Sequence, residues 1–443
     1  MELVTVLAAC LAWCSTGSRA PGQEMPVRLT LADAIQRGVQ ANLSVLLATA
    51  QTDAAAGTRL RRLSAALLPR VNAQTYANYQ NRDLRAFGIS LPGMPEVVGP
   101  FSNYDIRLYA QQNVFDLQGL NLLRASNHDL EADRLSEQDA CDMIVRAVAA
   151  LYLNGESQQA RAEAAQSRVT ASTTLLKLAT DKHDEGTATG VDVLRAQVQL
   201  ANDRQALLVA ETQRQQALLA LARSIGMSPG TPIELAEKLT FQSETLGEAE
   251  SLIPAAMMRR ADFRSLQSER AGLVDRQRAN RARSYPKLSV NGNFGGIGRS
   301  VGGMQATGLI QGQIDFTLYD RDREGEAVEI QSQLHGVDER IADMRRGIEE
   351  DVQSALLNLK SAAQQVDVAQ QGQSLAEREL TMAQDRFAQG TANNVEVVTA
   401  QDELTRAQEN YIVAVTSHVD ARFALARALG DTEKNVTEPV PAP

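Results

Sequence analysis

The 443-residue sequence is poor in cysteine, in aromatic residues and in long apolar stretches. Two of its three cysteines, Cys10 and Cys14, lie in a segment that resembles an export signal, so a disulfide framework is excluded. We interpret Cys141, which has no histidine near it in the sequence, as a packing residue. No run of 18 apolar residues follows the N-terminus, which excludes a transmembrane helix but not membrane-spanning strands.

The charge and the missing motifs exclude further classes of protein. The formal net charge is −10, which argues against nucleic acid as a partner, because phosphate binding needs clustered Lys and Arg. The four histidines are far apart, and the sequence has no HExxH, CxxC, phosphate loop or nucleophile elbow. The Glu-x-x-His motifs of a di-metal carboxylate enzyme are also missing. We therefore predict a protein that is not an enzyme and that needs no metal or cofactor.

The two ends of the chain are predicted to lie outside the fold. Residues 1–20 resemble a signal peptide that lacks its basic start. The run Leu-Ala-Ala-Cys ending at Cys10 resembles a bacterial lipobox, which would place a lipid on Cys10, and cleavage after Ala20 is the alternative. The tail 431–443, which ends in Pro-Val-Pro-Ala-Pro, is predicted to be disordered.

The chain contains an internal duplication. Residues 176–186 read LKLATDKHDEG, and residues 380–390 read LTMAQDRFAQG. The run LARSIG from Leu221 matches LARALG from Leu425 at the same offset of 204 residues. One constant offset over such a distance indicates duplication without insertion.

Each repeat has the same predicted order of elements: a helix, a proline, two strands, a very long helix, a glycine turn and a second helix. The first repeat is predicted at 28–228, with helices at about 31–67, 117–184 and 190–226 and strands at about 70–83 and 103–115. A linker at 229–250 leads to the second repeat at 251–430, with helices at about 251–283, 321–388 and 394–429 and strands at about 286–297 and 306–319. Thr30 and Asp33 are typical of a capping box, and Pro69 and Pro286 mark the transitions from helix to strand.

The longest predicted helices are too long for a globular core. No proline occurs between Pro100 and Pro229 or between Pro286 and Pro439. A helix over 117–184 would measure roughly 100 Å at 1.5 Å per residue. Such a helix must lie in a coiled coil or a tubular bundle. Taken alone, the helical pattern is also compatible with an ordinary antiparallel bundle.

The predicted strands alternate between apolar and polar residues. From Gly308, Ile310 and Ile314 share one face, and Gln311 and Gln313 share the other. Similar alternation begins at Val71, Tyr104 and Leu288. Runs of about ten residues with one apolar face suit tilted strands that cross a bilayer.

Aromatic residues support that interpretation. Residues 69–116 and 285–320 hold 11 of the 17 Phe and Tyr, as expected of interfacial girdles. Two soluble hairpins that cap a bundle are the alternative. If the strands do cross a membrane, four of them cannot close a barrel, so several copies must combine. Eight strands would enclose only their own side chains, so a conduit needs three or more copies.

The duplicated plan, the two prolines and the paired turns together resemble TolC-like outer membrane factors. The turns read Gly-Thr-Ala, followed by Val-Asp-Val-Leu from Val191 and Val-Glu-Val-Val from Val395. The resemblance covers about residues 28–430. It implies a mainly α fold with a small β part, in which a trimer shares a 12-stranded transmembrane β-barrel, four strands per protomer, above a long α-helical barrel. It also implies that the linker 229–250 is equatorial.

The resemblance further implies a function. The protein would be a passive channel in the outer membrane of a Gram-negative cell, reaching into the periplasm. It would be a homotrimer that serves a tripartite efflux or type I secretion system, contacting outer-membrane lipid, a periplasmic adaptor protein and an inner-membrane transporter. A soluble periplasmic coiled-coil scaffold or adaptor is the alternative function.

The site residues follow from the same resemblance. Those implied for the tip turns and adaptor docking are Gly186, Thr187, Gly190, Asp192, Gly390, Thr391 and Val395. Glu396 occupies the first position of an acidic ring at the periplasmic entrance, and Thr399 stands at the second position, where the family has an acid. The resemblance thus implies that Glu396 acts in gating and selectivity, and a helix cap is the alternative role. The family's tyrosine and arginine latch is replaced by Phe387 and Ala392.

Overall fold

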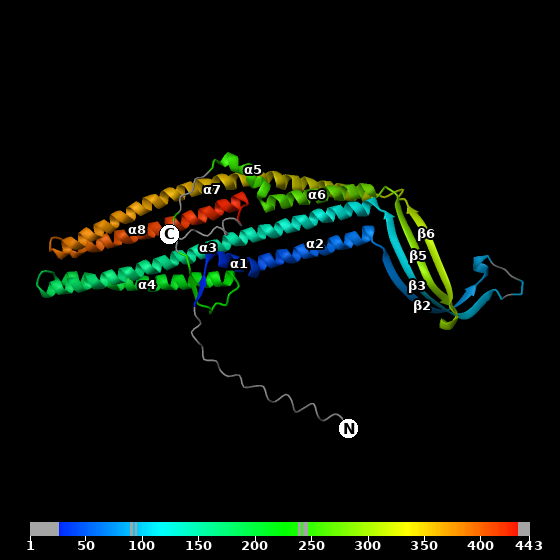
Figure 1. Cartoon of the computed structure of the whole chain (residues 1–443), viewed down its shortest axis with the longest axis horizontal. Coiled ribbons are helices and arrows are strands. Elements are labelled where there is room, and N and C mark those ends of the chain that lie inside the picture. Colours follow the sequence, from blue (N-terminus) through cyan, green and yellow to red (C-terminus); the bar gives the residue numbers. More distant parts are fainter. Residues whose placement is uncertain (1–25, 89–91, 94, 238–240, 242–246, 433–443) are drawn as a thin grey trace, which may run out of the picture. The chain divides into compact units, whose positions relative to one another are not determined.

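The computed structural model describes residues 26–88, 92–93, 95–237, 241 and 247–432 (Figure 1). The signal segment with Cys10, and the tail from residue 433 onward, lie outside the described residues. In chain order the helices are α1 (Leu31–Ala41), α2 (Leu43–Leu67), α3 (Leu117–Asp184), α4 (Gly190–Ser224), α5 (Ala249–Arg259), α6 (Ala261–Ala282), α7 (Asp322–Ala388) and α8 (Asn394–Leu429). The strands are β1 (Val27–Leu29), β2 (Arg70–Asp83), β3 (Val97–Phe115), β4 (Ile233–Leu235), β5 (Lys287–Gly298) and β6 (Gln305–Asp315), and two 3₁₀ turns lie at Arg85–Phe87 and Val301–Gly303.

The chain folds as two compact units, each of which takes segments from both repeats. Of the described residues, the first unit comprises 26–41, 147–237, 241 and 362–420. The second comprises 42–88, 92–93, 95–146, 247–361 and 421–432. The compact units therefore do not follow the boundaries of the predicted repeats, because α3, α7 and α8 each contribute to both.

The long helices reflect the absence of proline and the abundance of alanine. α3 has 68 residues and α7 has 67, and the observed bounds of α3 coincide with the predicted range. In α4, small and large side chains alternate on the buried face, which lets neighbouring helices approach closely. The buried positions are Ala196, Leu200, Asp203, Ala210, Ala217, Leu221 and Ala222.

The sequence predicted one helix over 31–67, and this prediction was wrong. The backbone of Asn42 is extended, at φ −73° and ψ 131°, and separates α1 from α2. Its side-chain Oδ1 accepts a hydrogen bond of 2.9 Å from the backbone N–H of Ser44. Asn42 is therefore the N-cap of a new helix, because its side chain satisfies a backbone donor that the helix itself leaves free.

The predicted helix over 251–283 is likewise two helices. The break is at Arg260, at φ −58° and ψ 123°. It lies 218 residues after Asn42, close to the 217 residues that separate Pro69 from Pro286. The duplication therefore preserves the break as well as the helices. α5 also starts before the predicted range and contains Pro254 within its second turn.

Four strands form one antiparallel sheet in the order β2-β3-β5-β6 (Figure 1). β3 is longer than the predicted 103–115, because β2 continues beyond a bulge and pairs Asp83 with Val97. β6 is shorter than the predicted 306–319. Its ladder with β5 ends at the pair Lys287 and Asp315, because Pro286 precedes Lys287 and has no N–H to donate.

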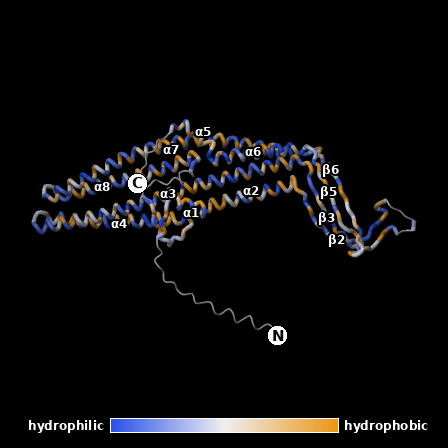
Figure 2. The backbone as a smooth tube through the Cα atoms, viewed as in Figure 1, coloured by the Kyte–Doolittle hydropathy of each residue, from blue (hydrophilic) through white to orange (hydrophobic). Residues whose placement is uncertain are grey.

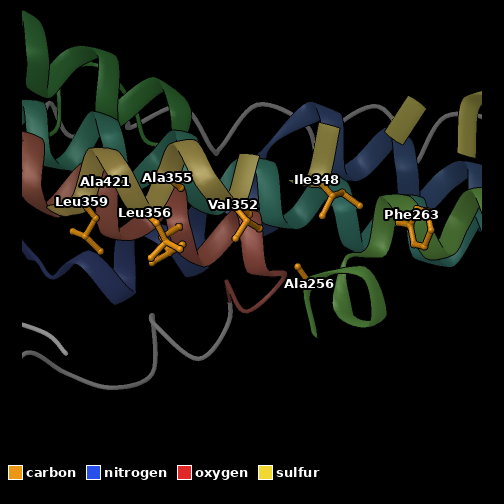
Figure 3. Packing of buried hydrophobic residues seen from close by; sticks show 10 residues of the cluster. Ala256, Phe263, Ile348, Val352, Ala355, Leu356, Leu359 and Ala421 are labelled. Atoms are coloured by element: carbon orange, nitrogen blue, oxygen red, sulfur yellow. The ribbon is translucent and has the colours of Figure 1, made fainter. Parts of the chain in front are cut away.

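Each unit has its own apolar core. In the second unit, Phe263 of α6 belongs to a cluster with Ile348, Val352 and Leu359 of α7 (Figure 3). In the first unit, β1 pairs in parallel with β4, and the buried Tyr152 donates a hydrogen bond of 3.1 Å to the carbonyl of Leu29. Of the helices in the described residues, none has a stretch long and apolar enough to cross a membrane.

Candidate functional site

The turn between α3 and α4 is a tight glycine turn followed by a capped helix. Gly186 has φ +75°, a left-handed conformation that favours glycine at a helix end. Thr187 closes the turn, since its hydroxyl donates to the carbonyl of Lys182 at 3.0 Å. The carboxylate of Asp192 then accepts hydrogen bonds from the N–H of Thr189 at 3.0 Å and from its hydroxyl at 2.7 Å. Those bonds, with that from the hydroxyl foremost, lower the pKa of Asp192.

The turn between α7 and α8 repeats this backbone 204 residues later. Gly390 has φ +74°, and the hydroxyl of Thr391 donates to the carbonyl of Arg386 at 3.0 Å. The start of α8 differs from that of α4. Asn393 Oδ1 accepts a bond of 3.3 Å from the N–H of Glu396, but the carboxylate of Glu396 binds Arg386.

Arg386 and Glu396 form an ion pair across the second turn. Arg386 Nη1 lies 2.7 Å from Glu396 Oε1, and the side chains are 57% and 38% exposed. The carboxylate that the sequence analysis assigned to an entrance ring or a helix cap therefore has a cation beside it. Thr399, the second position of that ring, is exposed and donates its hydroxyl to the carbonyl of Val395 at 2.9 Å.

Side chains join the two turns to each other within the first unit. Lys182 Nζ donates to the carbonyl of Ala388 at 3.0 Å and lies 5.5 Å from the ring centre of Phe387. The fully buried Asn394 donates from Nδ2 to the carbonyl of Asp192 at 3.0 Å. Phe387 is buried in an apolar cluster. The members of this cluster are Leu175, Leu178, Leu380, Ala383, Phe387, Val397 and Ala400.

Both turns also present an exposed valine. Val191 and Val395 each follow a glycine turn by a few residues, and both are exposed. Apolar side chains exposed at equivalent places in both repeats are suited to contact another protein. Gly190, the first residue of α4, and Thr391 are exposed beside them.

The sheet has one apolar and one polar face, as its register shows. Leu108 of β3 pairs with Ala73 on one side and with Phe294 on the other, and all three point to the same face. Figure 2 shows hydrophobic and hydrophilic positions that follow one another along the strands. Ile310 and Ile314 of β6 belong to the apolar face and are exposed.

The opposite face carries amides and an ion pair. Arg107 Nε donates to Asp105 Oδ1 at 2.6 Å, and Arg107 Nη1 donates to Asn293 at 3.4 Å. Gly295 lies under the arginine, and a Cβ there would be 2.7 Å from Arg107 Cγ. The sheet therefore separates an apolar surface from a hydrophilic one. Pro69 and Pro286 directly precede β2 and β5, where the chain passes from helix to strand.

The helices of each unit form a row with two open edges. In the second unit, α2 contacts α3 through Arg59 and Asn127 at 2.6 Å, and α3 contacts α6 through Asp129 and Arg276 at 2.6 Å. α6 contacts α7 through several ion pairs, among them Arg270 with Asp338 at 2.6 Å. The order α2-α3-α6-α7 matches the strand order, so α2 with β2 and α7 with β6 are the edges.

In the first unit the order is α4-α3-α8-α7. Arg214 of α4 donates to Gln159 of α3 at 3.3 Å, and Arg161 of α3 binds Glu409 of α8 at 2.5 Å. Apolar clusters join α8 to α7. The outer helices α4 and α7 expose rows of large apolar residues. These are Val191, Leu194, Val198 and Leu208 on α4 and Val368, Leu375 and Met382 on α7.

Comparison with known proteins decides the family. The family described as outer membrane efflux protein matches residues 34–227 and 252–431. The chain belongs to the outer membrane efflux protein family. The pyoverdine export outer membrane protein OpmQ of Pseudomonas aeruginosa is 23% identical over 379 residues, which are 83% of this chain and 78% of that protein. The probable efflux pump outer membrane protein TtgC of Pseudomonas putida is 22% identical over 337 residues, which are 74% and 67% of the two chains.

Solved structures show the fold of this efflux family. The outer membrane protein VceC of Vibrio cholerae superposes with a TM-score of 0.76 at 18% identity and covers 90% of this chain and 96% of that one. CusC superposes with a TM-score of 0.75 at 15% identity and covers 94% and 95% of the two chains. The TolC-like fold is thereby confirmed, and the family match confirms the location in the outer membrane. The family and the fold are those of channels.

Three residues that make contacts at the two turns have no signal in the sequence. Arg386 is an unremarkable arginine in a helix until the turn brings it to Glu396, and no spacing rule predicts a pair ten residues apart across a turn. Lys182 and Asn394 each bind a backbone carbonyl of the other repeat, a contact without a sequence pattern.

Proposed function

We propose that three copies of the chain form the outer-membrane channel of a tripartite efflux system, a passive duct coupled through an adaptor protein to an inner-membrane transporter. The observation that carries this proposal is the four-stranded sheet with an apolar face, a polar face and two unpaired edges. Family membership supports the efflux role, and the similarity to the pyoverdine export protein OpmQ and the probable efflux pump protein TtgC favours efflux over polypeptide secretion.

The sheet cannot lie in lipid alone. Each unpaired N–H or C=O in hydrocarbon costs several kcal/mol, so β2 and β6 need partner strands. Copies of the chain supply them, because the β2 edge of one copy is antiparallel to the β6 edge of the next. Two copies give a barrel that its own side chains fill, and three give 12 strands around a conduit. The polar face, with Arg107 and Asn293, then lines the water-filled interior.

The helices continue the same arrangement. In the first unit, the exposed apolar rows of α4 and α7 lie at opposite edges of the row of helices. Joining α7 of one copy to α4 of the next buries both rows and closes a helical barrel. A heterologous contact of this kind generates a closed ring when its rotation closes.

The turns are proposed to form the periplasmic tip. Glu396 would line the entrance and Thr399 would lie beside it, while the exposed residues of both turns, including Val395, Thr391 and Thr187, would contact the adaptor. Each Glu396 carries its own counter-ion, Arg386, so three copies give a ring of ion pairs rather than a ring of bare carboxylates. We therefore propose that this entrance discriminates less between cations and anions than an acidic ring would.

Conductance in a planar lipid bilayer tests the proposed function. Detergent-purified protein is expected to give discrete, stable current steps, because a sealed trimer encloses a water-filled path. Heat-denatured protein in the same detergent is the control. Absence of steps from a preparation that remains trimeric would overturn the channel proposal.

A further inference from the structure

The two open edges of the second unit carry opposite charges where the helices meet the sheet. From residue 54 to residue 82 the chain has no acidic residue. Within it, Arg59 of α2 binds Asn127, and beyond Arg59 the end of α2 and the start of β2 carry three more exposed arginines, Arg61, Arg62 and Arg70. We call these three residues the basic edge.

The other edge, at the end of β6 and the start of α7, is acidic. Between residues 315 and 329 there are six acidic residues and two arginines. Asp320, Asp322 and Glu326 bind Arg283 of α6 at 2.5, 3.2 and 2.7 Å. The remaining acids, Asp315, Glu324 and Glu329, are exposed, and we call them the acidic edge.

Among the residues that the structure describes, no ion pair joins any arginine of the basic edge or any carboxylate of the acidic edge to an opposite charge. The strand order β2-β3-β5-β6 places the two edges on opposite sides of the sheet, so they cannot meet in one copy.

An apolar residue lies within each charged group. Leu60 precedes Arg61 and is 60% exposed, and Val328 precedes Glu329 and is 69% exposed. Isolated exposed charges need no partner, but charges of opposite sign around apolar residues on two complementary edges are the composition of an interface.

We propose that the basic edge of one copy docks on the acidic edge of the next, and that this contact selects the neighbour during assembly of the trimer. The partner is a second copy of this chain, because only a copy presents the acidic edge beside a free β6 strand at the same level. This inference rests on the proposed trimer and adds the residues that form its seam at the base of the sheet.

The contact between the two edges chiefly determines which edges of neighbouring copies pair. Like charges facing each other oppose the wrong pairings, basic edge to basic edge or acidic edge to acidic edge. Opposite charges favour the antiparallel approach of β2 and β6 before the apolar residues and the backbone hydrogen bonds form. The seam therefore joins unlike edges, as a ring requires.

Charge reversal of the full-length chain tests the seam. Arg61→Glu with Arg62→Glu reverses the basic edge, and Glu324→Arg with Glu329→Arg reverses the acidic edge. Each double variant is expected to lose trimer in favour of monomer on size exclusion in mild detergent. The chain that carries all four changes is expected to recover the trimer, because the charges are again complementary.

A matched control separates the seam from charge in general. Arg134→Glu with Arg264→Glu reverses two exposed arginines on the inner helices α3 and α6, and this variant is expected to remain trimeric. If both double variants remained trimeric, the seam would be overturned. The same holds if the chain with all four changes formed no more trimer than the double variants. A wild-type chain that is itself monomeric would overturn the proposed trimer and the seam together.

Discussion

At the helix break of the first repeat one amide, that of Asn42, caps the next helix, whereas at the equivalent break of the second repeat a charged network surrounds Arg260. Arg260 binds Asp262 and Asp351, each at 2.7 Å, and Arg427 lies between Asp139 and Asp262. The backbone break is the same, but one repeat stabilises it at the surface and the other among buried charges.

The tips differ in the same way. Asp192 in the first repeat caps α4, and Glu396 at the equivalent position pairs with Arg386. The same backbone turn is therefore compatible with different arrangements of polar side chains. Residues freed from a capping role in one repeat are available for function, as we propose for Glu396.

The largest difference between the repeats is expected at the two breaks. Arg260→Leu removes a buried cation and is expected to destabilise the protein by about 3 kcal/mol, the lower end for a broken buried pair, because Asp262 loses its hydrogen-bonded partner and keeps only the more distant Arg427. Asn42→Ala removes one capping bond and is expected to cost about 1 kcal/mol. Thermal unfolding followed by circular dichroism measures both, with Arg264→Leu on the exposed side of α6 as the control. Equal losses at the two breaks would contradict the comparison.

The next largest effect is expected from removing the contacts that join the two turns. Lys182→Met and Asn394→Ala each remove a hydrogen bond between the repeats, and each is expected to weaken the contact between the two turns by about 1–3 kcal/mol. In planar bilayers these variants are expected to be open for a larger fraction of the time than the wild type. Lys177→Met, an exposed lysine on the same helix, is the control. Unchanged opening in both variants would show that other contacts hold the tip closed.

The capping carboxylate of Asp192 is expected to make the stability of the first turn depend on pH. Hydrogen bonds from Thr189 hold the pKa of Asp192 below its usual value, so its stabilisation is present above the unfolded pKa and is lost as the pH falls through the folded pKa. Asp192→Asn is therefore expected to cost about 0.5–2 kcal/mol at neutral pH, and this cost is expected to disappear only below the folded pKa, which is lower than the ordinary value of about 4. Unfolding midpoints across about pH 2–7 check this. A constant difference at every pH would exclude the carboxylate as the cause.

The ion pair at the second tip is expected to have the smallest energetic effect. Because it is largely exposed, it is worth about 0.2–1 kcal/mol, which corresponds to at most about a five-fold change in a permeability ratio. Arg386→Gln is expected to shift the reversal potential towards cation selectivity, and Glu396→Gln towards anion selectivity. Arg195→Gln at the first tip is the matched control, since Asp192 remains in its cap. Identical ion selectivity in all three variants would contradict the proposal that Glu396 and Arg386 line the entrance.

Most of the fold was predictable because it depends on patterns that repeat along the chain. Absence of proline, heptad spacing and alternation predicted α3, α8 and β2 at their observed bounds. The breaks at Asn42 and Arg260 were missed because a single polar residue within a helical pattern carries little weight. Asn42 followed by Ser44 was the one local signal, typical of an N-cap.

The candidate site was predictable only in part. Gly186 and Gly390 were found from their repeat, and a left-handed backbone explains them. The partners of Glu396 and Asn394 depend on how helices distant in sequence lie beside each other, and no local pattern encodes that. The charged segments are visible in the sequence, but only the strand order shows that they lie at opposite edges of the sheet.

The mass of the protein extracted from membranes in mild detergent tests the central claim most directly. The proposal requires that the β2 and β6 edges are each paired with another copy, so native mass spectrometry is expected to show three chains. A single chain that stays folded and soluble after the detergent is removed would contradict it.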